Sequence, residues 1–189
     1  MHYLLEKLQK DHRNLEKILD LLTSQLDHFL AGRESDFDLK IELLEYMEAY
    51  ADQAHHPMEN VMFAVARPMA TDQADLLDRL TQQHRELAQL TRTFRNSLEN
   101  IYQGGVMQRD ELELQGREFI ALQRQHIALE EQEAFPMLDQ LLQEQDWARV
   151  IEQSPSYDDP VFDKPDKIRF QILFEYLHKV EQEKTPAIG

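Results

Sequence analysis

No cysteine occurs among the 189 residues of this chain. Disulfide bonds, iron–sulfur ligation, thiolate zinc sites and cysteine nucleophiles are therefore excluded. Basic residues are also few, since 20 Lys and Arg stand against 36 Asp and Glu and leave a net charge of −16 at pH 7. A field of that sign repels phosphate backbones and anionic lipid surfaces, so we expect no nucleic acid and no membrane as a partner.

Long apolar runs are missing as well. The longest, residues 61–66, is far too short to cross a bilayer, and charged residues lie near the N-terminus where a signal peptide needs an apolar run. The sequence therefore predicts a cytoplasmic protein. Glycine is scarce too, with five residues, and the helical pattern breaks near residues 31–36, 67–72 and 103–105.

Between these breaks, apolar residues recur at steps of three and four, which is typical of helices buried on one face. Four such stretches occupy residues up to about 30, 36–66, 72–102 and 106–142. At ~1.5 Å per residue, each helix is expected to be ~45 Å long. Long amphipathic helices with short connections predict an all-α fold, an up-down-up-down antiparallel four-helix bundle over residues 1–142.

Residues 143–189 have a different residue pattern and form a predicted C-terminal extension. Prolines at positions 155, 160 and 165 break the first part, and one amphipathic helix follows with Ile168, Ile172, Leu173, Tyr176, Leu177 and Val180 on one side. That apolar side must be covered. It packs either on the bundle or on a second subunit, so a homodimer through this helix is one of two arrangements that the sequence leaves open.

The two halves of the predicted bundle repeat one polar pattern, a lone histidine on the first helix and a His-x-x-x-Glu pair on the second. The repeated residues are His12, His55 and Glu59 in the first half and His84, His126 and Glu130 in the second. The lone histidines are 72 positions apart, from 12 to 84, and both members of the pair are shifted by 71. Residues four apart share one face of a helix, so each pair points at a single place.

The lone histidines fall within leucine stripes, which directs all six polar side chains into the bundle interior. Burying even one polar group without a partner costs ~1–3 kcal/mol, and a metal cluster satisfies all six groups at once. Imidazole and carboxylate together suit iron, manganese or zinc, and carboxylates on facing helices can bridge two ions. Coordination positions left over are then open to a small exogenous ligand.

Taken alone, each part of the pattern has an ordinary explanation that involves no metal. A single histidine on an apolar stripe is usually a core residue, and a single His-x-x-x-Glu is often a surface pair. The duplicated arrangement favours the metal site over a metal-free helical interaction module, and the histidine content disfavours a di-metal hydrolase. Outside the six residues, the sequence has no serine–histidine arrangement and no glycine-rich phosphate loop, so it leaves open whether the protein is an enzyme.

Five short motifs carry a resemblance to a known family: Asp11-His12, His55-His56-Pro57-Met58-Glu59-Asn60, Gln83-His84-Arg85, His126-Ile127-Ala128-Leu129-Glu130-Glu131 and Phe135-Pro136. Over about residues 1–142 the chain resembles the hemerythrin family, in the branch of HHE cation-binding domains. The resemblance implies an antiparallel four-helix bundle that holds two non-haem iron ions, bridged by oxo and carboxylate groups, with O₂ or NO as its small diatomic ligand.

Within that family, the set of four histidines and two glutamates is similar to the repair-of-iron-centres proteins. That similarity implies a role in the response to nitrosative or oxidative stress, or in the repair of iron centres. The alternative is an O₂-binding storage or sensing protein, or an iron-holding protein without catalysis. Oxygen-carrying hemerythrins use a fifth histidine as a ligand, which the predicted set lacks.

Two further residues interrupt the second predicted helix. His56 follows His55 and points about 100° away from it on an α-helix, so we expect it to support the site or to lie on the surface rather than to bind metal. Pro57 removes one backbone donor, and it is predicted to kink the helix or to start a new turn beside the metal.

Overall fold

The computed structural model describes residues 1–33, 36–156 and 158–184, with side chains described as far as residue 179. The described elements are α1 (Tyr3–Leu30), α2 (Phe37–Tyr46), η1 (Met47–His55), α3 (His56–Ala66), α4 (Ala74–Tyr102), α5 (Arg109–Leu129), η2 (Glu130–Ala134), α6 (Phe135–Leu141), α7 (Glu144–Gln153) and α8 (Gln171–Lys184). The two η elements are π-helical, and the others are α-helical.

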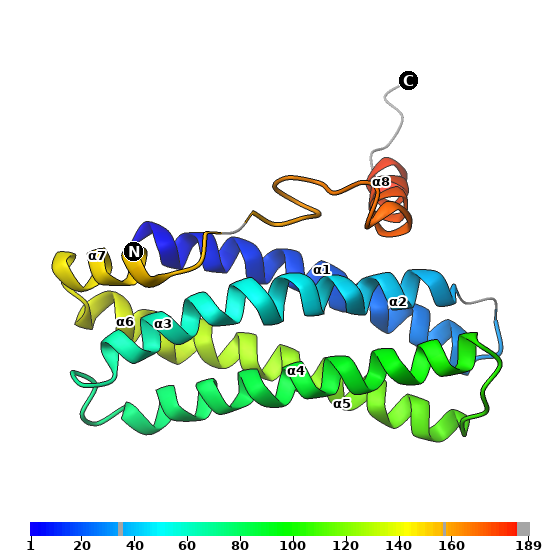
Figure 1. Ribbon diagram of the computed structural model, residues 1–189, viewed down its shortest axis with the longest axis horizontal. Helices are drawn as coiled ribbons and strands as arrows, with labels where there is room; N and C mark the ends of the chain where they lie inside the picture. Colours follow the sequence, from blue (N-terminus) through cyan, green and yellow to red (C-terminus); the bar gives the residue numbers. More distant parts are fainter. Residues whose placement is uncertain (34–35, 157, 185–189) are drawn as a thin grey trace.

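Four long antiparallel rods form the body of the molecule (Figure 1). They are α1, the continuous run α2–η1–α3, then α4, and the continuous run α5–η2–α6. This arrangement confirms the predicted all-α four-helix bundle. Side-chain caps begin the first two rods, where His2 accepts a hydrogen bond from the backbone N–H of Leu4 and Asp36 accepts one from that of Leu39.

Each composite rod changes from π-helix to α-helix just before a proline. The N–H of His56 donates to the carbonyl of Ala51, five residues back, and Pro57 follows; the N–H of Phe135 donates to Glu130 in the same way, and Pro136 follows. Proline lacks an N–H and is tolerated in the first turn of a helix, so a new α-helix starts at each of these places. A new turn at Pro57 was expected from the sequence.

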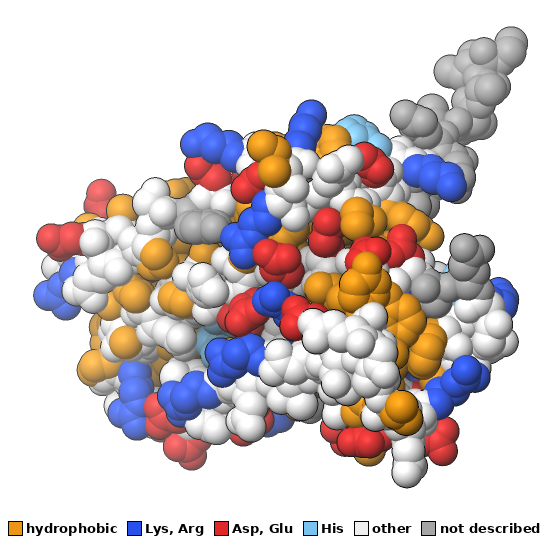
Figure 2. All heavy atoms as spheres, turned by 45° about the vertical axis from the view of Figure 1, so that its right-hand side comes forward, with side chains coloured by type: hydrophobic (Ala, Val, Ile, Leu, Met, Phe, Trp, Pro, Cys, Tyr) orange, Lys and Arg blue, Asp and Glu red, His pale blue; other side chains and the backbone are white. Residues whose placement is uncertain are grey.

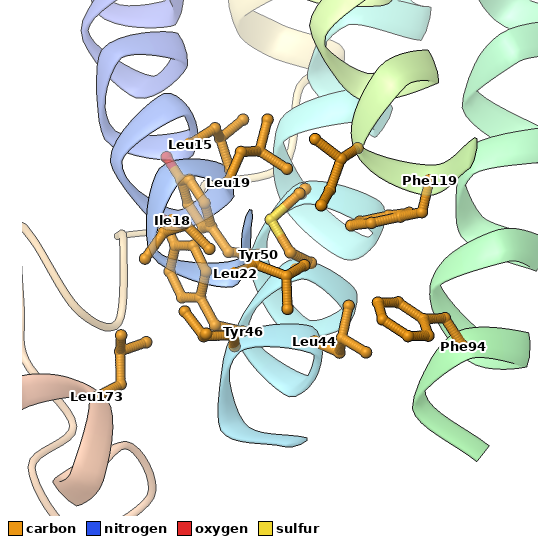
Figure 3. Close-up of a cluster of buried hydrophobic side chains, with 14 of the residues drawn as sticks. Leu15, Ile18, Leu19, Leu22, Leu44, Tyr46, Tyr50, Phe94, Phe119 and Leu173 are labelled. Carbon is orange, nitrogen blue, oxygen red and sulfur yellow. The ribbon is translucent and has the colours of Figure 1, made fainter. Parts of the chain in front are cut away.

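The apolar core is divided in two along the bundle. On α1, Leu15 belongs to one hydrophobic cluster and Leu8 to the other, with His12 between them. Figure 3 shows the first cluster, in which side chains from α1, α2, η1, α4, α5 and α8 meet. A polar layer therefore separates two apolar regions. Close packing in each region holds the rods in place on its own side of the layer.

The C-terminal extension contains two helices within its described part, whereas the sequence predicted one. The unexpected helix, α7, begins with a capping box between Gln143 and Asp146 and buries Trp147 and Val150 against the bundle. Glutamine is not a usual N-cap residue, which is why the start of this helix carries no clear signal in the sequence.

Helix α8 lies across the bundle and is seen nearly end-on in Figure 1. It contacts α2. Leu173 on α8 and Phe170 just before it are buried in the first hydrophobic cluster. The apolar side of α8 is thus covered at least in part by the chain itself, and the side chain of Val180 lies outside the described residues. The division into a bundle of residues 1–142 and an extension of 143–189 stays a prediction.

Acidic and basic side chains are interspersed on the face that Figure 2 shows. Through the described ranges, none of the helices has both the length and the apolar character needed to cross a bilayer.

Candidate metal centre

The polar layer between the two apolar clusters contains all six residues that the sequence predicted as metal ligands. They come from every rod of the bundle and are 0–4% exposed: His12 on α1, His55 at the end of η1, Glu59 on α3, His84 on α4, His126 on α5 and Glu130 at the start of η2. The structure therefore brings the whole predicted set to one place. Their binding to a metal stays a prediction.

His12 and His55 form one side of this layer. The Oε1 atom of Glu59 lies 3.5 Å from His12 Nε2 and 3.2 Å from His55 Nε2. The Oε2 atom of Glu130 lies 3.3 Å from His12 Nε2. Two imidazole nitrogens and one oxygen from each glutamate thus gather around a common point.

His84 and His126 form the other side, with the remaining carboxylate oxygens. Glu59 Oε2 lies 3.4 Å from His84 Nε2, and Glu130 Oε1 lies 3.4 Å from His84 Nε2 and 3.2 Å from His126 Nε2. The two imidazole nitrogens are 3.0 Å apart. Glu59 and Glu130 therefore each direct one oxygen to each pair of histidines.

These separations fit coordination of a metal ion by the surrounding atoms. Two ligand atoms that lie ~2.1 Å from one ion and subtend ~90–110° at it are ~3.0–3.5 Å apart. The measured separations around each point run from 3.0 to 3.5 Å. All four oxygens of Glu59 and Glu130 are buried and meet no partner with hydrogen-bond geometry, so they carry the desolvation cost that a cation removes.

The electrostatics of the layer also suit a cation. Burial alone raises the pKa of Glu59, but the charge of His55 and contacts with His12 and His84 outweigh it and hold that pKa well below its ordinary value. Burial lowers the pKa of His55, yet Glu59 outweighs burial and raises this pKa to about 9. The carboxylate of Glu59 is therefore kept ionised, and an incoming metal displaces a proton from His55.

Each imidazole on the His84 side is oriented by an amide. His84 Nδ1 donates a hydrogen bond of 2.8 Å to Asn60 Oδ1, and His126 Nδ1 donates one of 3.1 Å to Gln83 Oε1. Amide carbonyl oxygens only accept, so the proton of the neutral ring resides on Nδ1. The lone pair on Nε2 is then directed toward the centre of the layer, as a metal ligand requires.

Each imidazole on the His12 side faces a carboxylate, and His12 is hydrogen-bonded to its own. His12 Nδ1 donates a hydrogen bond of 3.1 Å to Glu131 Oε1, and Asp11 Oδ2 faces His55 Nδ1 at 3.6 Å. The sequence analysis quoted Asp11, Asn60, Gln83 and Glu131 only within motifs and gave them no role.

His56, which the sequence analysis expected either to support the site or to lie on the surface, lies in the polar layer. Its side chain is 3% exposed, its ring stacks on His84 with centroids 4.4 Å apart, and its Nδ1 lies 3.4 Å from Asp52 Oδ1. Ligand atoms of His56, Glu59, His84 and His126 all lie within 4.8 Å of one another. A fifth imidazole therefore joins the His84 side of the layer.

The 100° step from His55 to His56 explains why His56 is buried beside His84. The run α2–η1–α3 has two neighbouring rods, α1 and α4, and both contact η1. His55 faces Asp11 and His12 on α1, so one step around the helix turns His56 toward His84 on α4 rather than toward solvent.

An open surface groove of about 500 Å³ reaches this layer between α1 and α5. His12 and Glu131 line it together with charged residues, among them Arg13, Lys17 and Arg124. Another groove, of about 520 Å³, lies at the end of the bundle around Met69 and Met137 and touches none of the six predicted ligands. The groove at His12 is therefore an approach to the layer for a small molecule or an ion.

Compared with models of known protein families, residues 3–138 match the one described as the hemerythrin HHE cation binding domain. The match covers all four rods and every residue of the polar layer. No curated protein and no solved structure matches the chain.

Proposed function

Because this chain belongs to the hemerythrin HHE cation-binding domain family, we propose that its polar layer holds two non-haem iron ions. The proposed ligands are His12 and His55 for one ion, His84 and His126 for the other, and Glu59 and Glu130 as bridges between the two.

The observation that carries this proposal is the way in which the two carboxylates divide their oxygens. Glu59 directs Oε1 toward His12 and His55, and Oε2 toward His84. Glu130 directs Oε2 toward His12, and Oε1 toward His84 and His126. Bridging of two ions needs oxygens divided in this way, whereas a single ion would draw both oxygens of a carboxylate, or one oxygen of each, to one point.

This mixture of donors suits iron, manganese or zinc, and the resemblance to the hemerythrin family favours iron among the three. Imidazole nitrogens and carboxylate oxygens suit iron, and His56 offers a further neutral nitrogen on the His84 side. When bound, a pair of iron ions supplies redox chemistry and exchangeable coordination positions. The chain holds and orients the ligands, and its two apolar clusters limit the access of water from above and below the layer.

We further propose that the centre binds or reacts with NO or O₂ in the response to nitrosative or oxidative stress, or in the repair of iron centres. The groove beside His12 and Glu131 supports this role, because it gives a small molecule a route to the layer. The similarity of the four-histidine, two-glutamate set to the repair-of-iron-centres proteins supports it as well.

The same groove supports a second candidate, an iron-holding or O₂-storing protein without catalysis. Glu131 is partly exposed in the groove and contacts His12, so an iron ion that leaves the layer passes a carboxylate on the way. The two candidates differ in how fast a chelator removes the iron. An iron-holding protein is expected to lose its iron to a chelator faster than a redox centre does.

The first experiment is a measurement of bound iron and of the visible spectrum after expression in iron-supplemented medium. Two iron ions per chain, with near-ultraviolet absorption from oxygen ligands to iron, are expected. Addition of NO to the reduced protein is then expected to change that spectrum. A chain that takes up no iron under reducing conditions contradicts the proposal and favours a helical interaction module instead.

A further inference from the structure

The groups that orient the imidazoles repeat along the chain with the same spacing as the proposed ligands. Asp11 and Gln83 each precede the lone histidine of their half, and they are 72 positions apart. Asp11 faces His55, and Gln83 accepts a hydrogen bond from His126. In both halves, therefore, the residue before the lone histidine faces Nδ1 of the histidine of the pair.

Asn60 and Glu131 form a second repeated set. Each directly follows the glutamate of its half, and they are 71 positions apart. Asn60 accepts a hydrogen bond of 2.8 Å from His84, and Glu131 accepts one of 3.1 Å from His12. Each therefore orients the lone histidine of the opposite half, which gives the layer an approximate two-fold arrangement.

This arrangement repeats the positions but not the charges. The groups behind His12 and His55 are carboxylates, whereas those behind His84 and His126 are neutral amides. Glu131 accepts from His12 Nδ1 and makes that imidazole a stronger donor, and Asp11, with Oδ2 3.6 Å from His55 Nδ1, adds negative charge beside the ion. Loss of one such partner typically weakens metal affinity by ~10–100-fold.

We propose that the two positions of the centre differ in affinity because of these four residues. The position between His12 and His55 binds its ion more tightly, and the position between His84 and His126 fills last and empties first. This inference rests on the two-ion function proposed above, and it assigns Asp11 and Glu131 as positioning residues that set the order of loading.

Two other groups act on the His84 side and do not reverse this order. His56 adds a nitrogen donor there, but a neutral one. The carboxyl of Asp52 contacts His56 rather than His84 or His126. Even when Asp52 is ionised, this one carboxylate stands against two, Asp11 and Glu131, on the other side.

Titration of the metal-free protein with Co²⁺, followed by visible absorption, tests the order. Two binding steps of different affinity are expected in the unmodified chain. His55→Ala should remove the tight step and leave the weak one, whereas His126→Ala should remove the weak step. Loss of the tight step in His126→Ala, or two steps of equal affinity in the unmodified chain, would overturn the proposal.

Changes of charge at the outer residues give a second test with matched variants. Asp11→Asn should weaken the tight step by ~10–100-fold and leave the weak step unchanged. Gln83→Glu, at the equivalent position of the other half, should strengthen the weak step by a similar factor. A gain of affinity cannot come from damage to the fold, so an unchanged weak step in Gln83→Glu contradicts the proposal even if Asp11→Asn folds poorly.

The titrations distinguish an error in the order of loading from an error in the proposed two-ion centre. An unmodified chain that binds fewer than two Co²⁺ ions contradicts the two-ion centre and the order of loading together. A chain that binds two ions, but whose affinities do not respond to Asp11→Asn and Gln83→Glu, contradicts the order of loading alone.

Discussion

The hydroxyl of Tyr46 on α2 donates a hydrogen bond of 2.9 Å to Asp159, a residue of the extension that lies 113 positions further along the chain. Both groups are buried, and Asp159 also accepts from the backbone N–H groups of Val161 and Phe162. This contact joins the loop before α8 to the bundle at the cluster that Figure 3 shows.

Tyr46→Phe should loosen that loop. Removing a hydrogen bond to a buried carboxylate is expected to lower the free energy of unfolding by about 1–3 kcal/mol. Urea unfolding measures this loss, and faster trypsin cleavage after Lys164 reports the loosened segment. Lys10→Ala is the matched control, because Lys10 pairs with Asp163 in the same loop but is exposed, and its loss should cost no more than about 1 kcal/mol. Equal effects of the two substitutions would count against a specific role of Tyr46.

Lys40 should contribute a rise in the stability of the protein with pH between about 8 and about 10.5. Its side chain is fully buried, and burial lowers its pKa from 10.5 to about 8. In that range the unfolded chain binds a proton that the folded chain does not, so a higher pH favours the folded state. Lys40→Met should remove up to about 3 kcal/mol of this rise, as measured by urea unfolding across the range. Parallel curves for the two proteins would show that Lys40 does not titrate in this way.

Removal of metal should lower the melting temperature of the protein. The carboxylate oxygens of Glu59 and Glu130 lose the cation that satisfies them in the buried layer. An ion present at ~100 times its dissociation constant stabilises the folded state by ~2.7 kcal/mol. Calorimetry with and without chelator measures the difference. The variant Glu59→Gln should show a smaller response to the chelator, and an identical response would contradict the role of Glu59 in binding.

Gly116→Val should destabilise the bundle without touching the metal layer. A Cβ atom at Gly116 on α5 would lie 2.8 Å from Leu26 Cδ2 and 2.9 Å from Phe94 Cζ, so the chain has no room there for a larger side chain. Overpacking of this kind costs about 1–3 kcal/mol. Valine is a better helix former than glycine, so a loss at Gly116 cannot come from helix propensity. Leu114→Val, on the exposed side of the same helix, shows the effect of a valine without overpacking. Chemical denaturation of both variants gives the comparison, and equal losses would exclude a packing effect.

The four-helix bundle and the six clustered residues were predictable from the sequence because both depend on local spacing. Steps of three and four placed the leucines of α1 on one side, and His12 with them. The duplicated pattern then distinguished His12 and His84 from ordinary core histidines. Neither inference required knowledge of which rods are neighbours.

Features that depend on neighbouring rods were not predicted. His56 is buried because the rod that carries it has α4 beside it, which the sequence alone does not reveal. Asp11 and Glu131 face histidines on other rods, and their roles were not predicted. The repeat did carry a usable signal for them, because Gln83 and Asn60 occupy the equivalent positions of the other half. The helix α7 was missed because its glutamine cap is a weak start signal.

The approximate two-fold arrangement has a consequence for how such a centre can be built. If two identical half-chains assembled the same layer as a dimer, the symmetry axis would give both ions identical surroundings. A change of Asp11 would then alter both halves at once. In this chain the halves are covalently joined, so position 11 and position 83 vary independently, and the carboxylate at one and the amide at the other can coexist. Joining the halves in one polypeptide is thus what permits a centre with two different ends.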